Sequence, residues 1–288
     1  MKSNVAIAHH AQITKGLAQA FELLGDLSDL FYDRNVAIKP NETWASPDNL
    51  TACTQADTVR SLIKMIKRYR PYKITVTGGS GAGETDQIFE YLGINKVISE
   101  EDVEFFDHNR GPFENMHLSY GPAREVVINP HILSFDTIIS LAQHKVHKRA
   151  EVTLTMKNIA MSFPAADYYG HPRWKYEHSQ ETFFNDLHGF IAAMLQRFPV
   201  QLGIINGHPA MIGTGPIGGK TFDSELVIAG RDFVAVDKIG ALILGKDNVS
   251  HIEQAANLGL GQSNLEKIEI SGISLEKAKE IFNRYANS

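Results

Sequence analysis

The chain has 288 residues, of which 43% are hydrophobic, and it carries a formal net charge of −5. A chain of this length can bury a large core, and its negative charge argues against nucleic-acid binding, which requires a basic face to neutralise phosphates. Its apolar runs all end well before the roughly 20 residues that a membrane span requires. Residues 1–15 lack the apolar segment and the cleavage site of a secretory signal. These features predict a cytoplasmic protein with no membrane or nucleic-acid partner.

The single cysteine, Cys53, limits the redox and metal chemistry that the chain can support. One thiol cannot form an internal disulfide or an all-cysteine zinc site, and it cannot supply the four thiolates of an iron–sulfur cluster. We therefore expect no self-contained iron–sulfur cluster.

Apolar periodicity predicts strands that alternate with helices along the chain. This order is typical of an α/β fold with three layers, in which a largely parallel sheet is flanked by helices. The whole of residues 1–288 is expected to form a single α/β unit, or two closely packed lobes. Strands are predicted at 5–7, 36–38, 73–77, 97–98, 103–106, 126–128, 135–141, 200–205, 225–229 and 267–270, and helices at 14–27, 54–69, 85–91, 180–196 and 234–244, with two more after 248. Residues 153–158 begin either a helix or a second crossing of the site.

Two segments break this regular pattern. Residues 164–179 have no period but are rich in aromatic, histidine and basic side chains, so they predict a lid over a site, with His171 and His178 as its proton-carrying members. Asp237 interrupts the apolar helix 234–244 and needs a hydrogen-bonding partner if it faces inward.

Polar residues that follow two of the early strands predict an anion site. Lys39 and Asn41 come directly after the strand 36–38, and the turn Gly78-Gly79-Ser80-Gly81 follows the strand 73–77. Glycines let the backbone approach a ligand, and the N–H groups at the start of the next helix favour an anion. In a parallel sheet these strand ends lie at one edge, where ligands bind. The alternative is that both segments are only tight structural turns.

A basic cluster follows the strand 135–141 and predicts the reactive centre. His147 titrates near neutral pH when unperturbed, whereas Lys157 needs burial or a cationic neighbour such as Lys145 or Arg149 before it can act as a base. We expect His147 and Lys157 to be catalytic, and Lys145, Asn158 and His171 to contact the substrate. A different reading is that His144, His147 and His171 bind a metal.

Several motifs in sequence order resemble the family of domains of unknown function numbered 362. They are Lys39-Pro-Asn41, Gly78-Gly79-Ser80, Asn129, Lys145-Val-His147, Thr155-Met-Lys157-Asn158, Gly213-x-Gly215-Pro216-x-Gly218 and Arg231-Asp232-x-Val-Ala-Val-Asp237, and the resemblance covers about residues 5–270. Many members of that family are associated with iron–sulfur clusters, but this chain lacks their cysteine motifs.

His147 and Lys157, ten residues apart, are also distantly similar to a pair in the nickel-pincer lactate racemase family. That similarity implies that His147 handles a proton or hydride or binds a metal, that Lys157 anchors a nickel-pincer cofactor, and that the segment carrying His171 closes over the substrate.

Three functions remain open on the sequence. The first is an enzyme that acts on a small anionic metabolite, a carboxylate or a phosphate, by proton chemistry of the racemase or isomerase type. The second is a non-catalytic module that binds a small ligand or a redox partner, and the third is a histidine-rich metal-binding protein.

Overall fold

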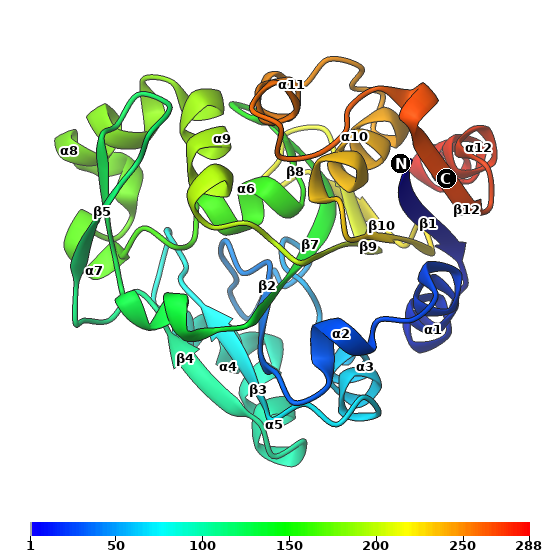
Figure 1. Cartoon of the computed structure of the whole chain (residues 1–288), viewed down its shortest axis with the longest axis horizontal. Coiled ribbons are helices and arrows are strands. Elements are labelled where there is room, and N and C mark those ends of the chain that lie inside the picture. The colour runs from blue at the N-terminus through cyan, green and yellow to red at the C-terminus, as the bar shows by residue number, and fades with distance from the viewer. Residues whose placement is uncertain (1) are drawn as a thin grey trace.

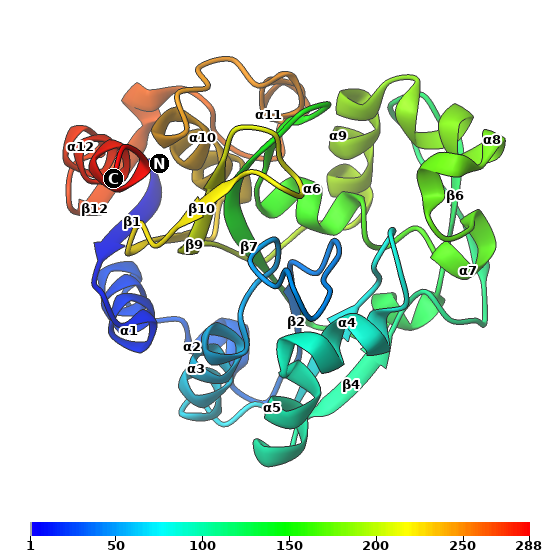
Figure 2. The ribbon, with the colours of Figure 1, turned by 180° about the vertical axis from the view of Figure 1, so that it is seen from behind.

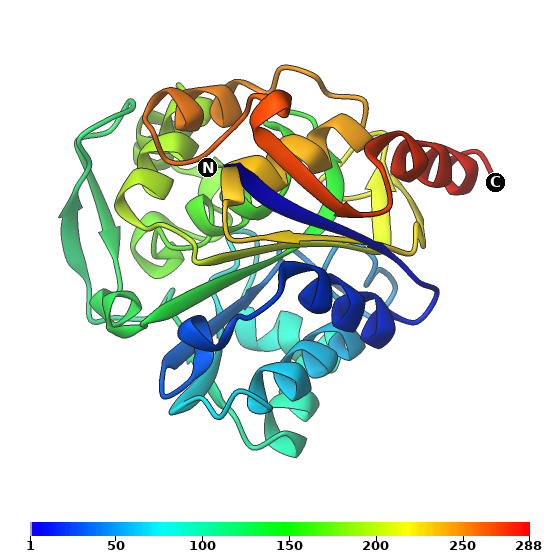
Figure 3. The same cartoon turned by 45° about the vertical axis from the view of Figure 1, so that its right-hand side comes forward.

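Side chains of the central strands alternate between the two faces of one sheet, and each face carries its own apolar core. Ile138 and Ile205 belong to one core, whereas their neighbours Ile139 and Ile204 belong to the other. Because both faces are covered, the sheet lies between two layers of helices in this computed structural model, which describes residues 2–288 (Figure 3). The predicted three-layer α/β fold is confirmed.

The sheet is largely parallel, as predicted. Its strands follow the order β12-β1-β11-β9-β7-β2-β3-β4, with β10 paired to β9 and β8 paired to β7. The five strands from β9 to β4 are parallel to their neighbours, and β8, β10 and β11 pair antiparallel. The bounds are β1 Ser3–His9, β2 Asn35–Pro40, β3 Lys73–Gly78, β4 Glu104–Asp107, β7 Thr137–His147, β8 Glu151–Thr153, β9 Leu202–Ile212, β10 Lys220–Phe222, β11 Leu226–Gly230 and β12 Ile268–Gly272.

The helices divide between the two faces according to their place in the sequence (Figures 1 and 3). Helices from the first hundred residues cover one face, and those that follow β8 cover the other. The first layer contains α1 Ile13–Leu24, α2 Ser28–Phe31, α3 Ala56–Lys67, α4 Thr85–Leu92 and α5 Ile94–Glu100; the second contains α6 Thr155–Ala160, α9 Leu187–Arg197, α10 Phe233–Ile243, α11 Ser250–Asn257 and α12 Leu275–Ala286. None of the helices in residues 2–288 is both long and apolar enough to cross a membrane.

Strands β2, β3 and β7 are adjacent and parallel, which brings their polar carboxyl ends to one edge of the sheet. Ile38 in β2 lies opposite Val76 in β3 and Ile139 in β7. These three strands are therefore neighbours in the sheet, and the residues that follow them can share one site.

Strand β7 is longer than its apolar pattern indicates. It was expected to end near Leu141, with the basic residues in the following turn, but it continues to His147 and then pairs with β8. Strand β9 likewise continues beyond Ile205 to Ile212. Polar side chains beyond the predicted ends of both strands find hydrogen-bond partners in neighbouring strands and loops. The change from apolar to polar residues therefore does not coincide with the end of either strand.

Two helical segments differ from the prediction. Val97 and Ile98 lie in α5 rather than in a strand, because Ile94, Val97 and Ile98 present one apolar helical face to the core. The expected helix 180–196 consists of a π-helical turn, η3 Gln180–Phe184, followed by α9. Asp186 separates them, and its carboxylate accepts a hydrogen bond from the N–H of Gly189 as the cap of α9.

The segment 164–179 contains three short helical turns instead of irregular loop. They are α7 Ala166–Tyr169, η2 Arg173–Lys175 and α8 Glu177–Ser179, and they lie beside the separate two-stranded sheet of β5 Glu114–His117 and β6 Glu125–Ile128 (Figure 2). The remaining short helices are η1 Pro130–Ser134 and η4 Leu265–Lys267.

The buried carboxylate of Asp237 in α10 holds the first turn of α6. Its two oxygens accept hydrogen bonds from the N–H of Thr155 at 2.8 Å, the hydroxyl of Thr155 at 2.6 Å and the N–H of Met156 at 2.9 Å. Burial raises the pKa of Asp237 to about 7, and the three donors oppose this rise. Asp237 thus has the partner that its apolar surroundings require, and it fixes the helix that carries Lys157 and Asn158.

Replacing Asp237 should therefore destabilise the fold. Asp237→Ala leaves buried donors of α6 without an acceptor and should lower the free energy of unfolding by about 3 kcal/mol, whereas Asp237→Asn retains one acceptor and should cost less. Urea unfolding measures both values, with the exposed Asp247→Asn as control. Equal stability of Asp237→Ala and the parent protein would show that this anchor contributes nothing.

Candidate functional site

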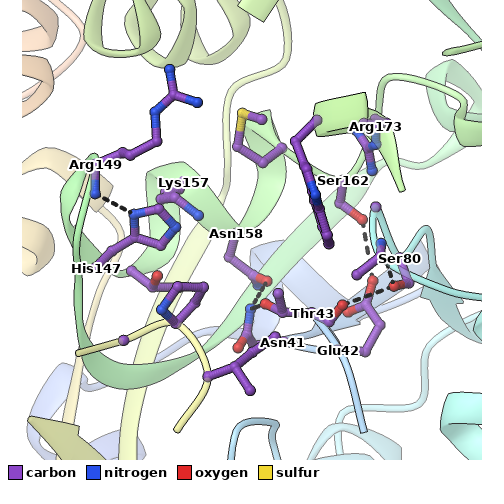
Figure 4. A pocket seen from close by; sticks show the side chains of 18 of the residues that line it. Asn41, Glu42, Thr43, Ser80, His147, Arg149, Lys157, Asn158, Ser162 and Arg173 are labelled. Atoms are coloured by element: carbon purple, nitrogen blue, oxygen red, sulfur yellow. Dashed lines mark hydrogen bonds between the residues drawn. The ribbon is translucent and has the colours of Figure 1, made fainter. Parts of the chain in front are cut away.

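A cavity of about 760 Å³ lies at the carboxyl ends of β2, β3 and β7 (Figure 4). Its wall combines the loops after these strands with α6, the segment η2–η3 and the β9–β10 loop. The lining residues are Lys39, Asn41, Glu42, Thr43, Gly79, Ser80, Gly81, Ala82, His147, Lys148, Arg149, Thr153, Lys157, Asn158, Met161, Ser162, Arg173, Trp174, Gln180, Phe184, Thr214, Gly215, Pro216 and Ile217.

Lys39 lies on this wall but is already paired. Its ammonium donates to the carboxylate of Glu42 at 2.5 Å, to the carbonyl of Pro40 at 2.7 Å and to the side-chain oxygen of Asn158 at 3.2 Å. Burial lowers the pKa of Lys39, and Glu42 opposes that shift. Lys39 therefore acts within the wall of the cavity and is not a free cation for a ligand.

The ammonium of Lys39 also fixes the orientation of two amides. Because Lys39 donates to Oδ1 of Asn158, the Nδ2 group of Asn158 faces the carbonyl of Lys39 at 3.0 Å. Asn41 must then present its own Nδ2 to Oδ1 of Asn158, at 3.2 Å. The oxygen of Asn41 is left buried without a partner among residues 2–288, on the cavity wall.

Most N–H groups of the glycine-rich turn after β3 are already engaged within the protein, and only that of Gly81 donates no hydrogen bond among residues 79–83. The N–H of Gly79 donates to Glu42 at 3.0 Å, that of Ser80 donates to Thr85 at 3.2 Å, and that of Ala82 donates to the hydroxyl of Ser80 at 3.2 Å. A Cβ on Gly79 would lie 1.9 Å from Nε2 of His108, so this glycine is required for packing. Gly78 packs under α4 and does not line the cavity.

His147 is held in one tautomer by the turn that follows β7. Its Nδ1 accepts hydrogen bonds from the N–H groups of Arg149 at 3.1 Å and Ala150 at 3.0 Å. A neutral imidazole has one lone pair, so the ring proton is on Nε2. Burial, and then the charge of Lys157, lowers the pKa of His147 far below its ordinary value. His147 is therefore a neutral hydrogen-bond donor, and the expectation that it titrates near neutral pH is not met.

Lys157 lies beside His147 and is the least compensated charge of the cavity (Figure 4). It is only 8% exposed, and its ammonium makes no hydrogen bond to any residue in the described part of the chain. Burial, and then the charges of Lys145, Arg173 and Lys39, lower the pKa of Lys157 to about 7. Burial or a cationic neighbour was expected to lower the pKa of Lys157, and both burial and Lys145 do so, whereas Arg149 is not among the contributing charges.

Arg173 is a cavity residue that the sequence reading missed. It belongs to the predicted lid, is only 2% exposed, and donates from Nη2 to the carbonyl of Gly79 at 3.1 Å. Its Nε and Nη1 have no partner within residues 2–288. The basic and aromatic character of the segment predicted a lid with His171 and His178 as its functional members, whereas Arg173 and Trp174 are the lid residues that line the cavity.

Glu42 was also missed, although it stands three residues after Lys39 at a strand end. Opposite charges three residues apart can form an ion pair, and this spacing could have predicted the pairing of Glu42 with Lys39. With Glu42 included, the cavity wall holds five lysine and arginine side chains against one carboxylate.

The remaining predicted residues lie away from the cavity. Lys145 is buried and donates to the carbonyl of Ala52 at 2.6 Å. His144 projects to the other side of β7, where its Nε2 bonds the carbonyl of Gly240, and His171 pairs with Asp167.

The three histidines considered as metal ligands are not brought together. Among residues 2–288 no group of three or more histidine, cysteine or acidic side chains has a geometry suited to a metal ion. The lone pair of His147 is already engaged at Nδ1, so a neutral His147 has none left at Nε2 for the nickel of a pincer cofactor. The donor set does not fit that cofactor through His147.

Comparison with known proteins agrees with the resemblance seen in the sequence. A family described as Domain of unknown function (DUF362) matches residues 36–242, a shorter range than the expected 5–270. No curated protein matches the chain. The lactate racemase apoprotein from Thermoanaerobacterium thermosaccharolyticum has a similar fold, with a TM-score of 0.50 and 12% identity over 90% of this chain and 57% of that protein. The chain thus spans little more than half of that protein, and the likeness concerns the fold.

The pairing of Lys39 with Glu42 leads to a test by double substitution. Glu42→Gln leaves a buried ammonium without its counter-charge and should lower the free energy of unfolding by about 3–5 kcal/mol. Adding Lys39→Met removes the stranded charge and should recover part of that loss. Denaturant unfolding of the single and double variants measures the coupling, and additive losses would contradict it.

Lys157 should destabilise the folded protein in a pH-dependent manner. Below pH 7 both the folded and unfolded states hold the proton, so the cost of burying the charge is complete. Between pH 7 and 10.5 the unfolded state holds more protons, and stability rises with pH. Lys157→Met should therefore raise the free energy of unfolding most at pH 6 and progressively less toward pH 10. The exposed Lys15→Met is the control, and a loss of stability in Lys157→Met at pH 6 would refute the assignment.

Proposed function

We propose that this chain, which belongs to the DUF362 family, binds a small anionic metabolite and moves a proton on it as an isomerase or racemase does. The observation that carries the proposal is Lys157, a residue that is nine-tenths buried on the wall of a cavity with an excess of basic groups. Its amine has no hydrogen-bond partner in the described chain and opens into that cavity. A buried cation without a counter-charge destabilises the folded protein. Its presence on a cavity wall therefore points to a functional role.

The charge on the cavity wall selects the class of ligand. Lys39 and Glu42 neutralise each other, so Lys148, Arg149, Lys157 and Arg173 remain as the net charge. A carboxylate or phosphate would satisfy both the ammonium of Lys157 and the free donors of Arg173. Arg149 is more exposed and stacks on Phe184 with 4.6 Å between its Cζ and the ring centroid, so it belongs to the rim.

The two residues named as catalytic from the sequence take different roles in this proposal. With a pKa of about 7, the amine of Lys157 is present in both protonation states at neutral pH and can accept and return a proton. His147 donates a hydrogen bond from Nε2 and, being neutral, stabilises charge that develops on an oxygen of the substrate without competing for the proton.

The fold similarity to a lactate racemase apoprotein supports the choice of reaction class. Proton transfer at the carbon beside a carboxylate needs a base of near-neutral pKa and donors for the oxygens, and Lys157, His147 and Arg173 supply these. No step in this proposal depends on a metal.

Solvent isotope exchange tests the proposal. The protein is incubated in D₂O with a panel of small carboxylates and phosphorylated acids, and exchange of their carbon-bound hydrogens is followed by NMR. Lys157→Met should lower the exchange rate by about a hundredfold or more, and Arg173→Met should weaken ligand binding by about tenfold. Lys15→Met should match the parent protein.

The outcomes separate the candidate functions. Ligand binding without exchange in the parent protein would favour the non-catalytic binding module. The proposal is overturned if the parent protein neither binds any compound of the panel nor exchanges its hydrogens, and if Lys157→Met behaves like the parent protein.

A further inference from the structure

The cavity is larger than a small acid needs, and part of its wall is apolar. Its volume of about 760 Å³ lies within the roughly 300–1,000 Å³ of pockets that hold drug-sized ligands. Beside the basic groups, the wall carries the apolar side chains of Met161, Trp174, Phe184, Pro216 and Ile217. The proposed proton transfer makes no use of these side chains, so their presence in the cavity needs a separate explanation.

Met161 places an apolar group next to the proposed base. It follows Lys157 by four residues, at the end of α6, and its backbone N–H donates to the carbonyl of Lys157 at 3.1 Å. Residues four apart on a helix lie on the same face, with about 6 Å between their Cβ atoms. Both side chains line the cavity. The wall therefore changes from charged to apolar within one helical turn.

The segment η2–η3 supplies two aromatic rings to the same cavity. Trp174 directly follows the buried Arg173, but it is 49% exposed although it lines the cavity. The guanidinium of Arg149 already covers one face of Phe184. Aromatic rings bind other rings and alkyl groups through their faces and edges. The half-exposed ring of Trp174 is thus an open contact surface for an apolar part of a ligand.

Pro216 and Ile217 belong to a loop that is packed directly on β7. The N–H of Lys148 donates to the carbonyl of Gly215 at 3.0 Å. A Cβ on Gly215 would lie 2.0 Å from the carbonyl oxygen of Val146, so the loop approaches the strand as closely as a glycine allows. The apolar side chains that follow Gly215 are therefore part of a preformed wall.

The basic side chains of the wall do not require several charges on the ligand. Lys148 and Arg149 are exposed, and solvent screens their fields. Apart from the paired Lys39, the buried cations of the wall are Lys157 and Arg173 (Figure 4). One carboxylate has two oxygens and can accept hydrogen bonds from both. The remainder of the ligand then meets the apolar part of the wall.

We propose that the substrate class of this cavity is an acid with one anionic group and an apolar body of the size of a phenyl ring or larger. This inference rests on the proposed function, because its anionic group is the one that Lys157 and Arg173 bind there. The apolar body lies against Met161, Trp174 and Ile217. Its burial adds affinity that an acid as small as lactate cannot gain.

The first test measures binding alone. The chain has two tryptophans, Trp44 and Trp174, of which only Trp174 lines the cavity, so in Trp44→Phe the fluorescence reports on Trp174. In titrations with acetate, butanoate and hexanoate, affinity should rise about threefold for each added methylene. Phenylpropanoate should bind at least tenfold more tightly than phosphoglycerate or the uncharged phenylpropanol. Affinity that does not rise with apolar size, or tighter binding of phosphoglycerate, would overturn the inference.

Variants of the apolar wall provide the second test. Trp174→Ala and Ile217→Ala should each weaken the binding of phenylpropanoate by about tenfold, measured by calorimetry, and should leave the binding of acetate within twofold of the parent. Tyr72→Ala is the matched control, because Tyr72 is an exposed aromatic residue outside the cavity. Equal losses for the two acids, or unchanged binding of phenylpropanoate, would contradict the assigned contacts.

The isotope exchange assay separates this inference from the proposed function. Phenyllactate and lactate share the same reacting carbon and carboxylate, and exchange should be at least tenfold more efficient in phenyllactate, as measured by kcat/KM. Equal exchange in the two acids would overturn the substrate class and leave the proton transfer intact. Tight binding of phenyllactate with no exchange in any acid would overturn the proton transfer, and the ligand class would still be supported.

Discussion

The carboxylate of Asp237 stands at the centre of this structure because it connects the apolar core to the basic wall of the cavity. The side chain projects from α10 within the core, and its carboxylate accepts three hydrogen bonds from the first residues of α6. A helix of six residues has little intrinsic stability, so an external anchor must fix its position. Lys157 and Asn158 follow that anchor directly, and the placement of their side chains depends on it.

Charge is distributed over the cavity in two ways. At one end, Lys39 and Glu42 neutralise each other and organise Asn158 and Asn41 into a rigid set of hydrogen bonds. At the other, Lys157 lies buried without a counter-charge, and Arg173 contributes donors that the protein leaves unused. The first arrangement provides rigidity, and the second stores unfavourable electrostatic energy that an anion would relieve.

Sequence patterns identified the architecture because strands β2, β3 and β7 combine apolar runs with polar ends, and adjacency follows from the rules of parallel sheets. The same patterns placed Lys157 and His147 near one another. They did not determine charge states, since the tautomer of His147 depends on the N–H groups of the turn after β7. Arg173 was out of reach because its side chain crosses to Gly79, ninety-four residues away in the chain.

The contact between Gly79 and His108 changes how substitutions in the glycine-rich turn should be interpreted. Any side chain at position 79 would meet the imidazole of His108, whose ring also bonds Thr77 and Ser162. A variant at this position would disturb β3, the loop after β4 and the end of α6 together. A mutational screen scored only by activity would therefore count Gly79 as a ligand contact, although a side chain there is excluded by the imidazole of His108 and the carbonyl of Ser162.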